Sequence, residues 1–560
     1  MEYTVLSPWA KTDLKDGCGI NKRPETLEGK TIGLFAHFKQ HSPILLSLIG
    51  DELKKRYNCN VTSLQYPVST VEIPDDPEFD SRLKDWLKGV DCVVAALGDA
   101  GSCTLFLTYN TAYIEKLGVP AVLIANRHFT ETARYAAKIR NVPSLRIVES
   151  QMEDLSRVPK LDENTIDRLI RPTVEPVMDA VIDALTVPAS AKESEWIPPA
   201  DHFADAKYKG DIQQINRIFY QNGWTNGTPV VPPTEELVKE MLRGTDLPAD
   251  YVVGEIPPRR GLATVEKIAV NAVMAGCLPT YMPVLIACVK GMLDKRIHLE
   301  GWTCSASSWF PLIVLSGKIT KDLDMATGAA AVSPYRKASA TIAHAFQLII
   351  QNIGGTRPAR EDMSQMGHEN RFGVCIGEDL GDFGWPSLHS EYGIPEDSSA
   401  VTLFWPHDHN GIRGNDLPSL LRGMCDVKAV GFDPGCAYIL TPKCIEAFKK
   451  EGMSRRDVMD YICEYARKPM KGGNLRWISG NNHLPEGVQL PREESCSYRK
   501  FWTTDHLLIT FAGNASRFEG IAFPGGGDHG GPSCTEIEFP SGWNDLVAEY
   551  KDYSPKYIEY

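Results

Sequence analysis

The 560-residue sequence has no long hydrophobic run and no C-x-x-C pair. Its longest apolar stretches, such as residues 282–288, are far shorter than the ~20 residues that span a bilayer, and its first residues are polar. Fourteen cysteines spread along the chain without C-x-x-C spacing fit reduced thiols better than a disulfide framework or a structural zinc. We therefore expect a cytoplasmic protein with no membrane partner.

The sequence also lacks a net positive charge and recognisable phosphate-binding motifs. The net charge of −13 argues against a nucleic-acid partner, because such binding needs a clustered basic face. Residues 353–358 lack the Walker spacing, and no G-x-G-x-x-G follows the first expected strand, which argues against nucleotide cofactors. We expect a small-molecule substrate, and a homo-oligomer, most simply a homodimer, because closed symmetric assemblies are common.

The length requires more than one domain, since single cores stop growing near ~250–300 residues. From residue 30, short β-branched runs alternate with longer helical stretches, which is typical of a doubly wound parallel α/β sheet. The expected strands are residues 31–36, 60–66, 91–97, 120–125 and 144–148. The expected helices are 42–57, 79–88, one after Cys103, 130–140 and a long closing helix at 163–185. A linker at 187–201 places the first domain at residues 1–195.

Residues 196–560 indicate a larger mixed α/β domain. Its expected helices are 264–276, 282–293, 335–352, 417–425 and 454–467, and its expected strands are 311–316, 400–405, 427–432 and 506–511. Between them lie long loops rich in glycine, histidine and arginine. Loops of that length in a compact domain are usually functional or disordered, and their aromatic residues favour function.

The loop Gly98-Asp99-Ala100-Gly101-Ser102-Cys103 lies between an expected buried strand and an expected helix. A helix start directs free N–H groups and positive potential at any ligand there, and it can stabilise the thiolate of Cys103 as a nucleophile. Asp99 and Ser102 can assist proton transfer, and Gly101 and Thr104 can contact the substrate. The alternative is that Cys103 only packs beneath the helix and that Asp99 only caps it.

Three segments of this first region resemble a known family. They are KTIGL at residues 30–34, DCVVAALGDAGSCT at 91–104 and GVPAV at 118–122. They are similar to the UGSC-motif selenoprotein family, in which selenocysteine or cysteine is followed by Gly-Ser-Cys. That family is more distantly similar to the substrate-activating selenoprotein subunit of glycine, sarcosine and betaine reductases. The resemblance covers about residues 28–150 and implies a Rossmann-like fold. Residues 262–405 look like an uncharacterised region of proteins in the same group.

The sequence departs from this family at its reactive position. Where the family has selenocysteine, this chain has Ala100, so that only Cys103 remains. A selenenyl-sulfide or disulfide within the loop is therefore impossible, which argues against reductive cleavage of the glycine-reductase kind. Either Cys103 works alone, or a second thiol comes from the other domain.

Cys277 is the first candidate for that second thiol. It lies at a helix–helix junction after Gly276, with Asn271 on the preceding helix as a substrate contact. The alternative is a helix-ending glycine followed by a buried cysteine. Cys304 is a weaker candidate.

Loop histidines of the larger domain provide possible metal ligands. His407 and His409, in an H-x-H pattern, together with His529 can ligate zinc or iron. The sequence identifies no cofactor with certainty and leaves a divalent metal, Zn or Fe, open. The alternative is that loop histidines bind substrate through hydrogen bonds, or that one of them is a general base near Cys103.

Arginines and two further histidines are candidates for substrate binding. Arg357, Arg360 and Arg371 lie in one loop and can hold a carboxylate, although a solvated loop face is an equal alternative. His368 and His389 complete this set of expected substrate contacts.

Together these patterns favour an enzyme, a lyase or transferase that makes or breaks a carbon–sulfur or carbon–nitrogen bond on a small polar, anionic metabolite. Cys103 would be its nucleophile or its acid/base. The alternatives are a thiol oxidoreductase using Cys103 with Cys277, a metal-dependent lyase or hydrolase using His407 and His409, and a non-catalytic binding subunit.

Overall fold

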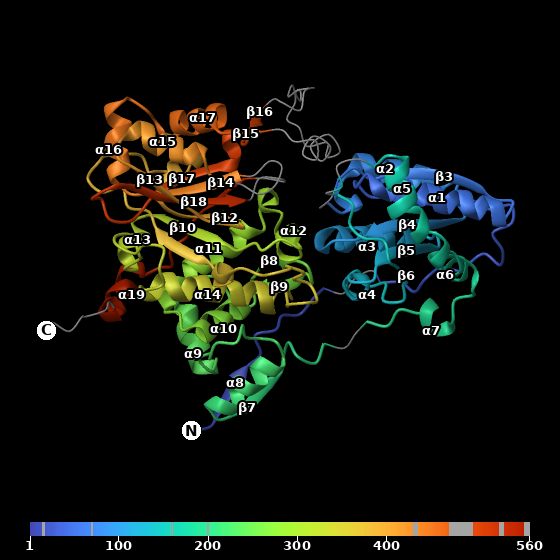
Figure 1. The fold of residues 1–560 in the computed structure, drawn as a ribbon. Helices are drawn as coiled ribbons and strands as arrows, with labels where there is room; N and C mark the ends of the chain where they lie inside the picture. Colours follow the sequence, from blue (N-terminus) through green and yellow to red (C-terminus); the bar gives the residue numbers. More distant parts are fainter. Residues whose placement is uncertain are drawn as a thin grey trace.

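The computed structural model describes residues 1–13, 17–68, 71–156, 158, 161–198, 201–428, 435–469, 497–525 and 531–553. Figure 1 shows a smaller α/β domain, in blue to cyan, beside a larger one, in green to red. Among the described helices, none combines the length and the apolar character needed to cross a membrane. Every cysteine that the structure describes is a free thiol.

The smaller domain contains a five-stranded parallel sheet with the strand order β3-β2-β4-β5-β6. Its strands are β2 (Thr31–Ala36), β3 (Asn60–Gln65), β4 (Cys92–Gly98), β5 (Ala121–Asn126) and β6 (Arg146–Ser150). Its helices are α1 (His41–Arg56), α2 (Pro77–Leu87), α3 (Gly101–Lys116), α4 (Thr130–Ile139), α5 (Glu163–Leu169), α6 (Glu175–Thr186) and α7 (Ala191–Ser194). The predicted doubly wound sheet is confirmed.

Two apolar layers enclose this sheet. Every residue of β4 and β5 is buried, as expected of strands covered on both faces. Residues of α1 and α6 share one core with the sheet, and residues of α2, α3 and α4 share the other. The chain therefore leaves β2 towards one face and β4 towards the other. In open α/β sheets, ligands bind beside the carboxyl ends of the strands at such a switch point.

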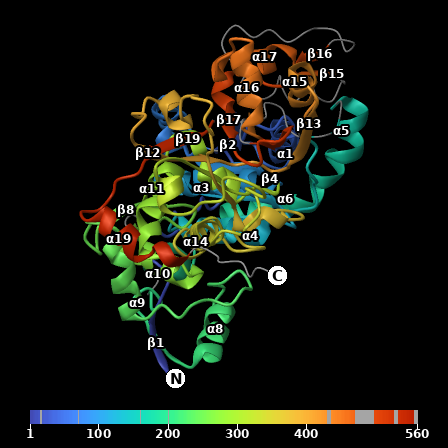
Figure 2. The same cartoon turned by 90° about the vertical axis from the view of Figure 1, so that its left-hand side faces the viewer.

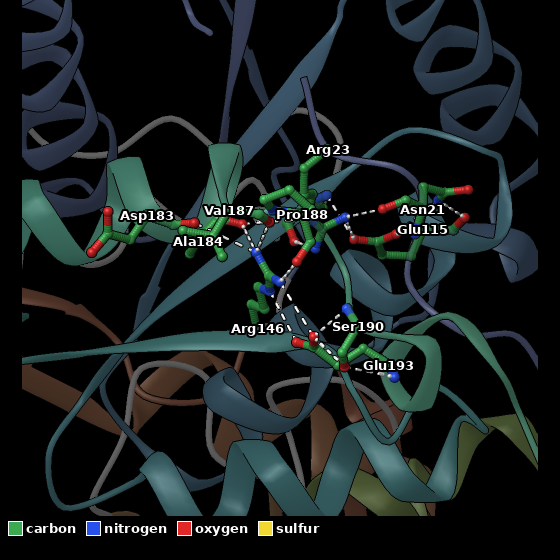
Figure 3. Close-up of polar contacts among 11 residues, drawn as sticks. Asn21, Arg23, Glu115, Arg146, Asp183, Ala184, Val187, Pro188, Ser190 and Glu193 are labelled. Atoms are coloured by element: carbon green, nitrogen blue, oxygen red, sulfur yellow. Dashed lines mark hydrogen bonds and ion pairs between the residues drawn. The ribbon is translucent and has the colours of Figure 1, made fainter. Parts of the chain in front are cut away.

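Two arginines, of which Arg23 is buried, attach the flanking segments to the sheet at the far end of α3 (Figure 3). The guanidinium of Arg23 donates to Glu115 Oε1 at 2.7 Å, and neither side chain is exposed. Arg146, at the start of β6, donates to the carbonyl of Val187 at 2.8 Å and to Glu193 Oε1 at 3.1 Å. The linker is thus held along the edge of the sheet, at the opposite end of α3 from Gly101.

The N-terminal strand belongs to the larger domain. β1 (Tyr3–Leu6) pairs antiparallel with β7 (Lys207–Gly210), and Val5 and Ala10 lie in the larger domain's core. The domain limits of 1–195 and 196–560 stay a prediction, and backbone pairing with β7 joins the first residues to the larger domain. Figure 2 shows β1 with α8 and α9 at the end of the molecule away from α16 and α17.

The larger domain has four layers, two of sheet between two of helix (Figure 1). The sheets β11-β10-β12-β19 and β13-β18-β14-β17 share an apolar core to which both contribute. Helices α10, α11 and α14 cover the outer face of the first sheet, and α15, α16 and α17 cover that of the second. The mixed α/β prediction for this region is confirmed.

The strands of this domain, besides β1 and β7, are β8 (Val252–Ile256), β9 (Gly261–Thr264), β10 (Leu312–Gly317), β11 (Val374–Gly377), β12 (Ser399–Phe404), β13 (Asn410–Gly414), β14 (Gly435–Leu440), β15 (Arg467–Pro469), β16 (Ser497–Arg499), β17 (Leu507–Phe511), β18 (Phe518–Gly525) and β19 (Ser533–Glu536). Its helices are α8 (Ile212–Gln221), α9 (Glu235–Met241), α10 (Val265–Ala275), α11 (Met282–Met292), α12 (Leu299–Thr303), α13 (Ile319–Asp322), α14 (Lys337–Asn352), α15 (Leu417–Cys425), α16 (Lys443–Lys450), α17 (Arg455–Tyr465) and α19 (Trp543–Glu549).

Two expected elements differ from the structure. The long helix expected at 163–185 is interrupted between α5 and α6 by a short 3-10 turn, Arg171–Thr173, because Pro172 and Pro176 lack the N–H that a continuous helix needs. The strand expected at 427–432 falls mainly on residues 429–434, outside the described residues. The neighbouring β14, a central strand, is absent from the prediction.

Candidate functional site

The larger domain covers the start of α3. A methyl group on Gly101 would lie 2.2 Å from the carbonyl oxygen of Cys304, 2.9 Å from Cβ of Met363 and 3.0 Å from the nitrogen of Ala306. Only a glycine permits this approach, because two of these neighbours are backbone atoms. The carboxyl end of β4, where a ligand site was expected, is therefore where the two domains meet.

A buried cluster of charges lies beside this contact. Asp99, the residue after β4, accepts a hydrogen bond from Lys39 Nζ at 2.7 Å and another from His41 Nε2 at 2.6 Å. Asp99 is 3% exposed, Lys39 4% and His41 1%. Lys39 Nζ also lies 3.1 Å from Asp154, whose side chain is 38% exposed. Two loops that are 60 residues apart in the sequence are thus joined by an ion pair inside the protein.

The sheet topology explains why these residues meet. Lys39 lies in the turn that follows β2, and His41 is the first residue of α1. β2 and β4 are hydrogen-bonded neighbours, so their carboxyl ends lie at the same edge of the sheet. The cluster therefore occupies the switch point between β2 and β4.

His37 presents a hydrogen-bond donor to this cluster. The backbone N–H of Leu97 donates to Ser42 Oγ at 2.8 Å, which leaves the Ser42 hydroxyl hydrogen to donate to His37 Nδ1 at 3.0 Å. In the neutral ring the proton is then on Nε2. This nitrogen is buried and lies 3.8 Å from Asp99 Oδ1, too far for a hydrogen bond, and no described residue accepts from it. Burial lowers the pKa of His37, which favours the neutral ring.

Burial and charge set the protonation states of the other groups. Burial alone would raise the pKa of Asp99, but Lys39 and the two histidines hold it well below its usual range. Burial alone would lower the pKa of Lys39, but Asp99 and Asp154 hold it above its usual range. At neutral pH the two therefore form a charged pair.

Cys103 lies in the first turn of α3, as predicted. Ala100 is extended, the helix starts at Gly101, and the first intrahelical bond runs from Thr104 N to Ala100 O at 2.9 Å. Burial raises the pKa of Cys103 to about 11, and Lys39 and a hydrogen bond with Ser102 act against this rise. Burial therefore disfavours a resting thiolate and favours a protonated thiol at neutral pH, because desolvation outweighs the helix start and the nearby lysine.

The expected second thiol lies elsewhere. Cys277 donates from Sγ to the carbonyl of Thr341 at 3.3 Å inside the larger domain, and burial raises its pKa to about 12. Asn271 is fully buried and hydrogen-bonded to Lys267 and Asn352. Both residues therefore have hydrogen-bond partners within the larger domain, and Gly276 ends α10 in the left-handed conformation just before Cys277. The backbone of Cys304, not that of Cys277, meets the loop.

The expected arginine cluster does not form. Arg357 donates to Glu361 Oε1 at 2.7 Å and to the hydroxyl of Tyr135, on α4, at 2.9 Å. Arg371 pairs with Asp362, and Arg360 is exposed. The guanidiniums do not converge, because Arg357 and Arg371 each neutralise a different nearby carboxylate. Arg357 instead links the two domains.

His389 is also not a substrate contact in this structure. It is fully buried in the larger domain, where its ring nitrogens lie 2.8 Å from Ser316 Oγ and 3.1 Å from the carbonyl of Pro395. Both of its hydrogen-bonding groups are therefore occupied by the fold itself.

The predicted metal histidines separate. His407 lies edge-on against Trp309, at 4.8 Å between ring centroids, while the ring of His409 lies 6.0 Å from that of His368. His407 is not part of any group of potential metal ligands among the described residues. His529 lies outside the described residues.

The sequence interpretation missed three residues of the site, His37, Lys39 and His41. The available signal was their position directly after the first expected strand, because the carboxyl ends of neighbouring parallel strands share one edge.

A second buried ion network fixes the domain contact. Arg140, at the end of α4, donates to Glu72 at 2.6 Å and to Glu300 of the larger domain at 3.1 Å. Its guanidinium lies 3.5 Å from the ring centroid of Tyr109 on α3. Arg260, from the larger domain, reaches the same Glu72 at 2.7 Å. Separating the domains would therefore break the Arg140–Glu300 and Arg260–Glu72 contacts, while Arg140 and Glu72 would stay paired within the smaller domain.

Comparison with known proteins gives one family match, to the model of the UGSC family over residues 4–186. A search of curated proteins found no match. The matched span contains the whole five-stranded sheet, the charged cluster and the loop from Gly98 to Thr104. Residues 4–186 are therefore similar to the UGSC family.

Proposed function

We propose that this chain is an enzyme, a lyase or transferase that makes or breaks a carbon–sulfur or carbon–nitrogen bond on a small polar, anionic metabolite, with Cys103 transferring the proton. The observation that carries the proposal is the convergence, at the switch point of the sheet, of a thiol, a buried Lys39–Asp99–His41 cluster and the covering backbone of the larger domain. Clustered ionisable groups with shifted pKa values at such a position favour catalysis over a purely structural role.

Cys103 would act as an acid. Breaking a carbon–heteroatom bond leaves an electron pair on the leaving sulfur or nitrogen, which needs a proton. A thiol that is protonated at neutral pH can donate that proton, and the thiolate that remains would be stabilised by Lys39 and by the start of α3. In the reverse direction the thiolate takes the proton back. Asp99 would stay charged and hold Lys39 and His41 in place.

Two unpartnered polar groups suggest where the anionic substrate would bind. His37 Nε2 and Thr104 Oγ1 are buried and have no hydrogen-bond partner among the described residues. Buried polar groups are nearly always satisfied, so such groups beside a candidate site fit a missing ligand. The carboxylate of the substrate would accept the N–H of His37, and the hydroxyl of Thr104 would pair with a polar group of the substrate.

The other function classes have less support. An oxidoreductase pairing Cys103 with Cys277 would need to bring out a thiol that donates to Thr341 inside the larger domain. Ala100 in place of selenocysteine also argues against a reductase related to the glycine, sarcosine and betaine enzymes. We propose a cytoplasmic location, which thiols without C-x-x-C spacing favour, and a homo-oligomer, because closed symmetric assemblies are common.

A ligand screen followed by product analysis tests the proposal. Amino acids, thioethers and small carboxylates are screened by thermal shift, and each stabilising compound is incubated with enzyme and analysed by mass spectrometry. We expect wild type and the control Cys59→Ala, a half-buried thiol outside the cluster, to convert a stabilising compound, while Cys103→Ala binds it without conversion. Equal conversion by Cys103→Ala would refute the role of the thiol, and stabilising compounds that no variant converts would favour a binding subunit.

A further inference from the structure

The larger domain brings three potential metal ligands together outside the site described above. His368 and Glu369 lie at the start of a 3-10 turn, Glu369–Phe372, and His409 directly precedes β13. Nδ1 of His368 lies 3.5 Å from one carboxylate oxygen of Glu369, and Nδ1 of His409 lies 3.9 Å from the other. One ligand atom from each residue lies within 4.8 Å of those from the other two.

We propose that His368, Glu369 and His409 bind a divalent transition metal, Zn²⁺ or Fe²⁺. Two imidazoles and one carboxylate are a donor set that both ions accept, and it leaves coordination positions open for water or a ligand.

The geometry needs only a small contraction. Metal–nitrogen and metal–oxygen bonds of about 2.0–2.1 Å in tetrahedral arrangement separate ligand atoms by about 3.4 Å. The two histidines lie 3.5 and 3.9 Å from different oxygens of the Glu369 carboxylate, and one ligand atom from each of the three residues lies within 4.8 Å of the others. The side chains of Glu369 and His409 are 70% and 48% exposed, so both can rotate inward. His368 is the fixed member, because its ring lies 4.3 Å from that of Phe310.

Nδ1 of His368 is available as a ligand atom. Nδ1 of His368 accepts a hydrogen bond from the N–H of Asn370 at 3.0 Å, which shows that this nitrogen carries a lone pair. A metal bound there would replace the Asn370 hydrogen bond.

Charge separates this group from a second group that meets the same distance criterion. His41, Asp99 and Asp154 also lie within reach of one another, but the ammonium of Lys39 lies 2.7 Å from one carboxylate and 3.1 Å from the other. A metal would have to displace that buried cation. Around Glu369, by contrast, no described lysine or arginine lies within 4.0 Å of the carboxylate. Its charge is left for an added cation to neutralise.

The proposed metal site lies on the loop that reaches the domain contact. Met363, which lies against Gly101, precedes His368 in the same loop, and this length of chain spans at most about 18 Å. The proposal is independent of the role of Cys103, because it rests only on the three ligands and their surroundings.

Titration of the full-length, metal-free chain tests the site. Zn²⁺ binding is measured by calorimetry, and Co²⁺ binding by the visible absorption that reports coordination number; Fe²⁺ is titrated without oxygen to distinguish the two ions. We expect His409→Ala and Glu369→Gln each to weaken binding of one metal ion per chain. The affinity should fall by more than the roughly 10–100-fold caused by losing a residue that only hydrogen-bonds to a metal ligand. The control His202→Ala, at an exposed histidine elsewhere, should bind as wild type does.

Two results would overturn the proposal. One is a wild-type chain that binds neither Zn²⁺ nor Fe²⁺. The other is a pair of variants, His409→Ala and Glu369→Gln, that bind with the stoichiometry and affinity of wild type. Both variants change exposed side chains, so that loss of folding, checked by thermal denaturation, should not obscure the answer. Because the metal alone is the probe, neither result bears on catalysis by Cys103.

Discussion

Replacing Asp99 by asparagine should destabilise the smaller domain strongly, because it leaves Lys39 as a buried cation with only Asp154 as its counter-charge. The pair lies at 2.7 Å with side chains 0% and 3% exposed. At an effective dielectric constant of 20, the attraction at this distance is about 6 kcal/mol, and removing one partner of a buried pair costs about 3–5 kcal/mol. Since Asp154 remains 3.1 Å from Lys39, we expect the lower end, about 3 kcal/mol.

An exposed pair in the same domain provides the matched control. Lys88 and Asp85 have the same separation of 2.7 Å, but their side chains are 77% and 74% exposed. Asp85→Asn should therefore cost less than about 1 kcal/mol. The double variant Lys39→Met/Asp99→Asn removes both buried charges and should be less destabilised than the sum of its single variants.

Denaturant unfolding of the wild type and variants gives these free energies, if the transition of the smaller domain is followed separately from that of the larger one. The lowered pKa of Asp99 also fixes the sign of the pH dependence. The carboxylate stabilises the folded protein at pH values above the pKa that Asp99 has in the unfolded chain. This stabilisation is lost as the pH falls through the pKa that Asp99 has in the folded protein. An Asp99→Asn variant no less stable than Asp85→Asn would refute the ion-pair account.

Two further predictions concern the domain contact and the buried histidine. Gly101→Ala should push the domains apart, because its methyl group would lie 2.2 Å from the carbonyl oxygen of Cys304. The free energy of unfolding should fall by about 1–3 kcal/mol. Gly89→Ala, whose methyl would approach nothing closer than 3.9 Å, is the control, and equal melting temperatures for the two variants would contradict the contact. The lowered pKa of His37 predicts that stability falls as the pH drops below about 6.5, because the unfolded chain then binds a proton that the folded one excludes. Melting curves from pH 7.5 to 5.5 should show a weaker dependence for His37→Gln than for His128→Gln, an exposed control, and identical slopes would sink the argument.

The sheet of the smaller domain was predictable because its strands are continuous apolar runs bounded by turn residues. Strand 31–36 was predicted with the bounds that the structure gives it. The long helix at 163–185 was wrong because two prolines interrupt a pattern that is otherwise helical. β14 was missed because the apolar run at residues 427–432 lies just before it, and the prediction placed the strand on that run instead.

The site was predictable only in part. The position of Cys103 in the first turn of a helix follows from a local glycine pattern. Its protonation state does not, because burial is a property of the assembled domains. Arg357 and His389 were assigned to substrate because polar loop residues look alike in a sequence, whether they face a ligand or neutralise one another. The structure pairs the first with Glu361 and the second with Ser316.

The most direct test of the central claim, that Cys103 is a protonated thiol governed by the charged cluster, is the pH dependence of its alkylation. Brief iodoacetamide treatment and peptide mass spectrometry give the rate at Cys103 from pH 6 upwards. The account predicts an apparent pKa near 11, which falls in Asp154→Asn, because the charge of Asp154 raises the pKa of Cys103. Glu153→Gln, at the neighbouring exposed carboxyl, should leave it unchanged. An apparent pKa below the ordinary ~8.5, the same in both variants, would contradict the account.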